Sequence, residues 1–208
     1  MKNQKLFKLG LTGSIATGKS TVLKMFEELG HVSFSADAIV HKLYQAEAVP
    51  LIEKFYPEAI IENKVDRAVL AKFLLANPQK ISQLEALIHP LVLEHYAQFI
   101  QNAQRSAQKL AIIDIPLLYE SKNNYELDAV AVTFCSEDTQ RQRAMARPDM
   151  TKQKFETILA RQISQDEKRR RADFEIDTNL PLENTKIQIV EIANQCLAIG
   201  AKNLDNGA

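Results

Sequence analysis

The sequence is poor in cysteine and in long apolar runs. Its two cysteines, Cys135 and Cys196, form no C-x-x-C pair and no metal-ligand pattern, so two reduced, buried thiols are expected. No apolar stretch approaches the roughly 18 residues needed to span a bilayer. The first apolar run, near residue 6, is also too short for a signal peptide. The chain is therefore predicted to be soluble and cytoplasmic.

Charge of one sign is also lacking, because 26 Lys and Arg balance 26 Asp and Glu. A generic nucleic-acid or membrane-surface binder needs a basic excess, so neither partner is expected. The balance is uneven along the chain. Residues 137–171 hold ten basic and six acidic residues, a net charge of +4, whereas residues 172–208 hold two and six, a net charge of −4. A basic segment thus lies inside a neutral protein.

The pattern of apolar residues is that of a globular α/β protein, with 46% hydrophobic and 25% charged residues. It predicts strands over 5–12, 31–35, 110–115, 127–134 and 173–177. Helices are predicted over 19–29, 137–146, 152–171 and 182–199, and residues 37–106 are almost entirely helical, with breaks at Pro50, Pro57, Asn77-Pro78 and His89-Pro90. The predicted domains are an α/β core (1–36, 107–136 and 172–208), a helical insertion (37–106) and a basic helical segment (137–171).

A phosphate-binding motif follows the first predicted strand. Residues 13–20, GSIATGKS, fit the pattern G-x-x-x-x-G-K-[ST] between an apolar strand and an amphipathic helix. The glycines let backbone N–H groups turn toward phosphate oxygens, and the helix adds its positive N-terminal end. Lys19 would reach the β- and γ-phosphates of a nucleotide, and the Ser20 hydroxyl would ligate Mg²⁺.

Residues 63–66, NKVD, match the guanine-reading pattern N-K-x-D of GTPases. They precede a predicted helix instead of ending a late strand, and no glycine of the chain has an Asp three residues before it, so D-x-x-G is absent. A γ-phosphate switch has no candidate sequence. We interpret the match as a coincidence.

A small-molecule kinase needs two carboxylates and mobile arginines, and the chain offers candidates for each. Asp37 follows the second strand and is placed to be the base. It could instead cap a helix over 38–47, or do both. Asp114 ends an apolar strand and could hold Mg²⁺, or could be a solvated strand-end carboxylate. The basic segment contains Arg143, Arg147 and Arg161, which could close over the nucleotide as a lid or lie on a solvated surface.

Two further features of the basic segment indicate structure instead of chemistry. Residues 168–171, KRRR, are predicted to be a solvated helix end. Ser164 and Glu167 form a capping box that would start this last helical stretch.

From about residue 7 to about residue 180 the chain resembles the dephospho-CoA kinase family, whose members catalyse the last step of coenzyme A synthesis. The resemblance rests on seven segments in order: GLTGSIATGKST (10–21), SADAIVH (35–41), VDRAVLAKFLL…LEALIHP (65–90), DIPLLYE (114–120), TQRQRAMAR (139–147), RQISQ (161–165) and ADFEIDTN (172–179). The family usually has Asp where this chain has Ser35, and glycine or serine is common where it has Ser14, Ala16 and Thr17.

The resemblance implies a role for each matching residue. Asp37 would activate the ribose 3′-hydroxyl of dephospho-CoA, Lys19, Arg143 and Arg147 would assist transfer, and Asn179 would lie beside the adenine of ATP. The ATP phosphates would be bound by Gly13, Ser14, Ile15, Ala16, Thr17, Gly18, Lys19, Ser20 and Thr21. The acceptor would be held by Asp37, Arg67, His89, Pro90, Asp114 and Arg161, and the metal by Ser20 and Asp114.

The prediction is therefore a P-loop NTPase-type α/β fold, a five-stranded parallel sheet flanked by helices, with a helical substrate insertion and a helical lid. The predicted activity is ATP-dependent, Mg²⁺-assisted phosphorylation of dephospho-CoA. A monomer is expected, and an oligomer stays open. Two alternatives stay open: another P-loop small-molecule kinase of the nucleotide or shikimate type, and a non-catalytic ATP-binding module.

Overall fold

The computed structural model describes residues 5–121 and 125–205. The chain folds into two compact units, one formed by residues 1–34 and 102–208 and the other by residues 35–101. The basic segment 137–171 belongs to the first unit. Each unit is described by itself below.

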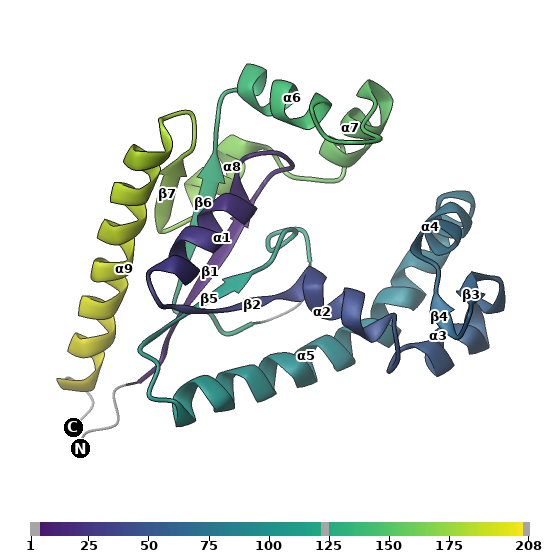
Figure 1. Cartoon of the computed structure of the whole chain (residues 1–208), viewed down its shortest axis with the longest axis horizontal. Coiled ribbons are helices and arrows are strands. Elements are labelled where there is room, and N and C mark those ends of the chain that lie inside the picture. Colours follow the sequence, from purple (N-terminus) through teal and green to yellow (C-terminus); the bar gives the residue numbers. More distant parts are fainter. Residues whose placement is uncertain (1–4, 122–124, 206–208) are drawn as a thin grey trace. The chain divides into compact units, whose positions relative to one another are not determined.

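The first unit is built on a five-stranded sheet with the strand order β2-β5-β1-β6-β7 (Figure 1). Its strands are β1 (Phe7–Gly13), β2 (Val32–Ser35), β5 (Leu110–Asp114), β6 (Ala129–Phe134) and β7 (Phe174–Asp177). The central strand β1 pairs in parallel with β5 and β6, and β6 pairs in parallel with β7. Parallel pairing brings the carboxyl ends of neighbouring strands to one edge, and Leu11 of β1 is in register with Asp114 of β5. The predicted fold class is confirmed.

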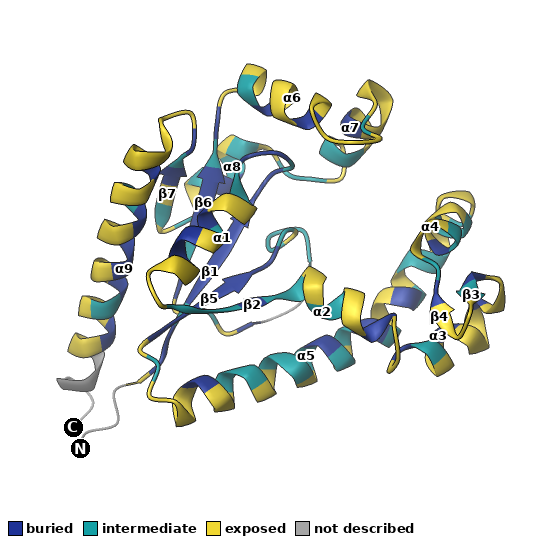
Figure 2. Ribbon diagram, viewed as in Figure 1, coloured by how far each residue is buried: buried dark blue, intermediate teal, exposed yellow. Residues whose placement is uncertain are grey.

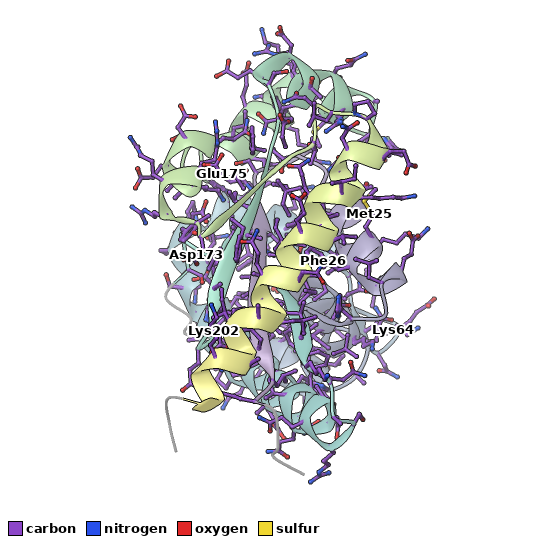
Figure 3. The ribbon with its side chains drawn as sticks, turned by 90° about the vertical axis from the view of Figure 1, so that its left-hand side faces the viewer. Met25, Phe26, Lys64, Asp173, Glu175 and Lys202 are labelled. Atoms are coloured by element: carbon purple, nitrogen blue, oxygen red, sulfur yellow. The ribbon has the colours of Figure 1, made fainter. Side chains whose placement is uncertain are left out.

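Helices α1 (Lys19–Glu28) and α9 (Leu182–Asp205) pack beside each other in this unit. Figure 2 shows a buried stripe along α9, and Figure 3 shows Met25 and Phe26 of α1 beside that helix. Phe26 and Ile189 are fully buried in one core cluster with the strand residues Leu9 and Leu11. The β1–α1 connection that carries the phosphate-binding motif is therefore anchored at both ends by buried side chains.

Both cysteines are free and buried, as predicted. Cys196 is fully buried in the core, and burial raises the pKa of its thiol to about 12, so it stays protonated at neutral pH.

The remaining helices of the first unit are α6 (Glu137–Met145), α7 (Lys152–Leu159) and α8 (Gln165–Arg171). The prediction of one helix over 152–171 is wrong, because α7 ends at Leu159 and α8 begins at Gln165, with Ser164 as its N-cap. The Ser164 hydroxyl accepts a hydrogen bond from the backbone N–H of Glu167 at 3.2 Å, which confirms the predicted cap. The Glu167 carboxylate does not complete the box as predicted: it pairs with Arg170 at 2.5 Å and Arg171 at 2.6 Å.

The prediction that residues 168–171 form a solvated helix end is wrong for the first of them. Lys168 is fully buried, and its Nζ lies 2.8 Å from Oε1 of Glu120. Arg169 stacks over the Phe134 ring, 4.0 Å from its centroid, and pairs with Glu175 at 2.7 Å. Helix α8 therefore contacts the sheet and the loop after β5 through two ion pairs, Arg169 with Glu175 and Lys168 with Glu120.

The second unit is mostly helical. It contains α2 (Ala36–Leu43), α3 (Val49–Phe55), a 3₁₀ turn (Pro57–Ala59), β3 (Ile60–Ile61), β4 (Lys64–Val65), α4 (Arg67–Ala76), a second 3₁₀ turn (Pro78–Lys80) and most of α5 (Ile81–Arg105). The hairpin of β3 and β4 was not predicted. It turns at Glu62 and Asn63, which both adopt positive φ, and neither is a glycine that would have marked the turn.

The predicted break at His89-Pro90 is also wrong, because α5 continues through both residues. Proline removes one backbone hydrogen bond and crowds the carbonyl four residues earlier. In a helix of 25 residues, the hydrogen bonds and side-chain packing on either side of Pro90 keep the chain helical.

Candidate active site

The phosphate-binding loop joins β1 to α1, and its two motif glycines are required by the structure. Gly18 has a φ of 86°, the left-handed region that favours glycine, and a Cβ there would lie 3.2 Å from Thr178. A Cβ on Gly13 would collide with the hydroxyl of Thr133. The loop curls because neither position carries a side chain.

Hydrogen bonds of threonine hydroxyls connect the loop to neighbouring strands. The Thr17 hydroxyl donates to the Ser14 carbonyl at 2.8 Å and lies 2.8 Å from the Thr133 hydroxyl of β6. The Thr178 hydroxyl, just past β7, donates to the Thr17 carbonyl at 3.0 Å. Ala16 adopts a φ of 62° between these contacts, so the loop keeps its curl with alanine at a position that favours glycine.

Gly18→Ala should weaken nucleotide binding and lower stability, because it combines backbone strain with a close contact to Thr178. Strain alone costs about 1–2 kcal/mol. Gly30→Ala is the matched control: it has the same φ of 86° but nothing within 4 Å of the added Cβ. Thermal unfolding and titration with ADP measure both effects. Equal losses of stability and ADP affinity in the two variants would contradict this account of the loop.

Lys19 begins α1, and its ammonium forms an ion pair with the carboxylate of Asp114 at the end of β5. Both side chains are largely buried, at 15% and 8% exposure. Ser20 is the second residue of α1 and is exposed. The motif lysine and the strand-end carboxylate predicted for the site therefore meet in the structure.

A cavity of about 240 Å³ adjoins the loop and is lined in part by two of the predicted arginines. Its lining residues are Ala16, Gly18, Thr21, Val22, Arg143, Arg147, Thr178, Leu182 and Thr185. Arg143 donates to the Thr178 hydroxyl at 3.0 Å and to its carbonyl at 2.8 Å, which fixes the guanidinium at the rim. Burial raises the pKa of the neighbouring Cys135 thiol, and the positive charge of Arg143 opposes that shift.

Two further predicted residues of the first unit lie on its surface. The Asn179 side-chain oxygen accepts from the Ser136 backbone at 2.9 Å, and its amide donates to Asp177 at 2.8 Å, so it joins the ends of β6 and β7. Arg161 is exposed in the connection between α7 and α8.

The second unit contains the predicted base. Asp37 lies in the first turn of α2 and is exposed. The alternative that Asp37 is the helix cap is wrong, because α2 begins at Ala36 and the Ser35 hydroxyl accepts from the Ala38 N–H at 3.4 Å. Serine and aspartate both cap helices well, so Ser35 can take over the capping that Asp would supply at that position.

Arg67 and His41 lie together in this unit, and Nη1 of Arg67 is 3.4 Å from Nδ1 of His41. His41 lies one helical turn after Asp37 on α2. Burial raises the pKa of the nearby Tyr44 hydroxyl, and the charge of Arg67 acts against that rise. His89 is half-buried and Pro90 is exposed midway along α5.

The residues of the N-K-x-D match have structural roles. Asn63 turns the β3–β4 hairpin, and the Asp66 carboxylate accepts from the N–H groups of Ala68 at 2.8 Å and Val69 at 2.9 Å, capping α4. This supports the interpretation of the match as a coincidence.

Asp66→Ala should therefore lower the free energy of unfolding by about 1 kcal/mol without changing nucleotide affinity. Asp66→Asn, which can still cap, should cost less. Thermal unfolding and nucleotide titration measure the two effects. Loss of GTP binding in Asp66→Ala with unchanged stability would restore the guanine-reading interpretation.

In residues 5–121 and 125–205 no group of three or more His, Cys, Asp or Glu side chains could hold a metal ion. The same residues include no helix long and apolar enough to cross a membrane. A metal at this loop would need phosphate and water ligands besides Ser20 and Asp114, and that mixed oxygen set is the one Mg²⁺ prefers.

A family model for dephospho-CoA kinase matches residues 7–184. The chain belongs to the dephospho-CoA kinase family. It is 45% identical over 184 residues to a dephospho-CoA kinase of Rhodopseudomonas palustris, covering 88% of this chain and 92% of that protein. The identity to the dephospho-CoA kinase of Agrobacterium fabrum is 44%, covering 88% and 95%.

Solved structures agree with this assignment. The dephospho-CoA kinase from Campylobacter jejuni is 27% identical with a TM-score of 0.62, covering 91% of this chain and 96% of that one. A protein from Thermus thermophilus, 24% identical with a TM-score of 0.80 and 91% and 97% coverage, supports the fold. Membership of the dephospho-CoA kinase family makes the chain a transferase, and neither of the two alternatives is favoured.

Proposed function

We propose that this family member transfers the γ-phosphoryl group of ATP to the ribose 3′-hydroxyl of dephospho-CoA, giving coenzyme A and ADP. The observation that carries the proposal is the meeting of Lys19 and Asp114 at the curled loop of residues 13–21. Phosphoryl transfer depends mainly on positioning and on charge stabilisation, and this pair places a cation and a carboxylate at the loop proposed to bind the phosphates.

The loop would hold the nucleotide. Its backbone N–H groups and the start of α1 would bind the phosphate oxygens, and Lys19 would leave Asp114 to contact the β- and γ-phosphates. Ser20 and Asp114 would hold Mg²⁺ together with phosphate and water oxygens. When bound, the metal neutralises charge on the β- and γ-phosphates. Asn179 would lie beside the adenine.

The second unit would hold the acceptor. Asp37 would accept the proton of the attacking hydroxyl, and its exposure leaves the carboxylate accessible to a substrate. Arg67 would bind the substrate with its guanidinium, and His89 and Pro90 would contribute from α5.

The basic segment would act as the lid. Arg143 and Arg147 would stabilise the charge that spreads over the transferring phosphoryl group, and Arg161 would contact substrate. Closure would exclude water and limit hydrolysis of ATP. We further propose that the enzyme acts as a monomer in the cytoplasm, without nucleic-acid or membrane partners.

A coupled assay of ADP release tests the proposal. Dephospho-CoA should stimulate turnover by purified protein in the presence of Mg²⁺ and ATP, whereas shikimate, gluconate and nucleoside monophosphates should not. If dephospho-CoA gives no turnover while the protein binds ATP, the proposal is wrong. Stimulation by one of the other acceptors alone would favour a different small-molecule kinase.

A further inference from the structure

Two glutamines hold the phosphate-binding loop by the backbone of one residue, Ile15. The Ile15 N–H donates to Oε1 of Gln162 at 3.0 Å. The Ile15 carbonyl accepts from Nε2 of Gln140 at 2.8 Å. Gln140 lies on α6 and is only 4% exposed, and Gln162 lies between α7 and α8. Both polar groups of one loop residue are thus bound by side chains from the basic segment.

A third glutamine continues this network. Nε2 of Gln165 donates to Oε1 of Gln140 at 3.2 Å, and Oε1 of Gln165 accepts from the Cys135 N–H at 3.1 Å, just past β6. The backbone partners determine how each amide is oriented, since an N–H can only donate and a carbonyl can only accept. With those orientations fixed, the remaining donor of Gln165 faces the remaining acceptor of Gln140. The chain of hydrogen bonds therefore runs from the sheet to the loop with every contact complementary.

The loop needs such support at this point. Ile15 directly precedes Ala16, whose φ of 62° is rare for a residue with a side chain. Unfavourable backbone conformations persist where surrounding contacts determine them. Hydrogen bonds on both sides of the Ile15 residue limit its rotation and so limit the relaxation of Ala16.

We infer that Gln140, Gln162 and Gln165 are positioning residues that hold the phosphate-binding loop in its nucleotide-binding conformation. None of them needs to touch the nucleotide, because they act through the Ile15 backbone. The inference rests on the proposed ATP site. It adds that the basic segment acts on the ATP site by holding the Ile15 backbone as well as through its arginines.

Two substitutions with the same change of charge test this inference. Gln140→Glu replaces the donor to the Ile15 carbonyl with a carboxylate oxygen, so the contact becomes repulsive. Gln162→Glu keeps an acceptor for the Ile15 N–H. A general effect of negative charge near the phosphates would weaken nucleotide binding equally in both variants, whereas the network predicts the larger loss in the first. Gln153→Glu, at an exposed position on α7, is the control.

ADP affinity by calorimetry and the KM values of both substrates are the readouts. In Gln140→Glu, the Kd for ADP and the KM for ATP should rise on the order of tenfold, with an unchanged KM for dephospho-CoA. In Gln162→Glu the rise should be smaller than in Gln140→Glu, because the contact with the Ile15 N–H is kept. If the wild-type protein does not bind ADP, the proposed function fails. If it binds and Gln140→Glu equals the control, or if both variants at the loop are weakened equally, the inference is overturned.

A second pair of variants covers the case in which Gln140→Glu does not fold. Gln140→Met keeps the length of the side chain and removes the donor. Gln165→Glu places a carboxylate against the Gln140 oxygen. Each should raise the Kd for ADP in folded protein, and unchanged ADP affinity in either one would contradict the network.

Discussion

Replacing Asp37 with Asn should lower kcat by a factor on the order of 10²–10⁴, because it removes the proposed general base while keeping the shape of the side chain. Asp37 is exposed in the first turn of α2, and that helix is capped by Ser35. The fold of this turn therefore does not depend on the Asp37 carboxylate as a cap. Melting temperature and ADP affinity should stay close to those of the wild-type protein, so the loss should fall on kcat.

Glu53→Gln is the matched control for this substitution. It removes a carboxylate from an exposed position on α3, in the same unit, and should leave kcat unchanged. A normal kcat in Asp37→Asn would show that Asp37 is not the base. A parallel fall of kcat and melting temperature would instead assign it a structural role.

Lys19→Met should lower kcat by a factor on the order of 10²–10³, comparable to the loss of one strong electrostatic contact to a transition state. The ammonium is the cation of the motif, and a methionine of similar length cannot stabilise charge on the β- and γ-phosphates. Stability should fall as well, because the largely buried Asp114 carboxylate loses its ion-pair partner. The double variant Lys19→Met/Asp114→Asn should recover stability and remain inactive, which separates the two roles.

Lys24→Met is the control on the same helix. The Lys24 side chain is 75% exposed and pairs with Glu28 at 3.9 Å, so its loss should change neither activity nor stability measurably. Steady-state kinetics and thermal unfolding give all the required values. If Lys19→Met keeps most of the wild-type kcat, phosphate binding by this loop would need another explanation.

The sequence predicted the loop after the first strand and the five strands of the parallel sheet correctly because both depend on local patterns. Apolar runs define the strands, and the motif spacing places Gly18 at the left-handed position that begins α1. The placement of Asp114 was also predictable, since a strand-end residue in a parallel sheet lies at the edge where the loop lies.

Features that depend on tertiary packing were not predictable in this way. Pro90 was expected to end a helix, yet it lies within α5, because the hydrogen bonds and packing of a long helix outweigh one local penalty. Lys168 looked like part of a solvated basic run, but its partner is Glu120, 48 residues earlier in the sequence. Asp37 was a possible cap by position, and Ser35 performs that role instead.

The network of Gln140, Gln162 and Gln165 also depends on tertiary contacts that the sequence does not reveal. Gln140, Gln162 and Gln165 have no regular spacing, and the groups that they contact include the backbone of Ile15 and Cys135. Nearly every residue type offers the same backbone N–H and C=O groups, so the identity of Ile15 or Cys135 does not indicate a glutamine partner. The segments TQRQRAMAR (139–147) and RQISQ (161–165) contain the three glutamines, but nothing in either segment indicates their partners.

Identification of the phosphorylated product tests the central claim most directly. Purified protein with Mg²⁺, ATP and dephospho-CoA should yield one ADP per molecule of coenzyme A formed, and ³¹P NMR should show the new phosphate as a monoester on the ribose 3′-oxygen. ADP formed without a new phosphate monoester on dephospho-CoA, or a phosphate on another oxygen, would contradict the account.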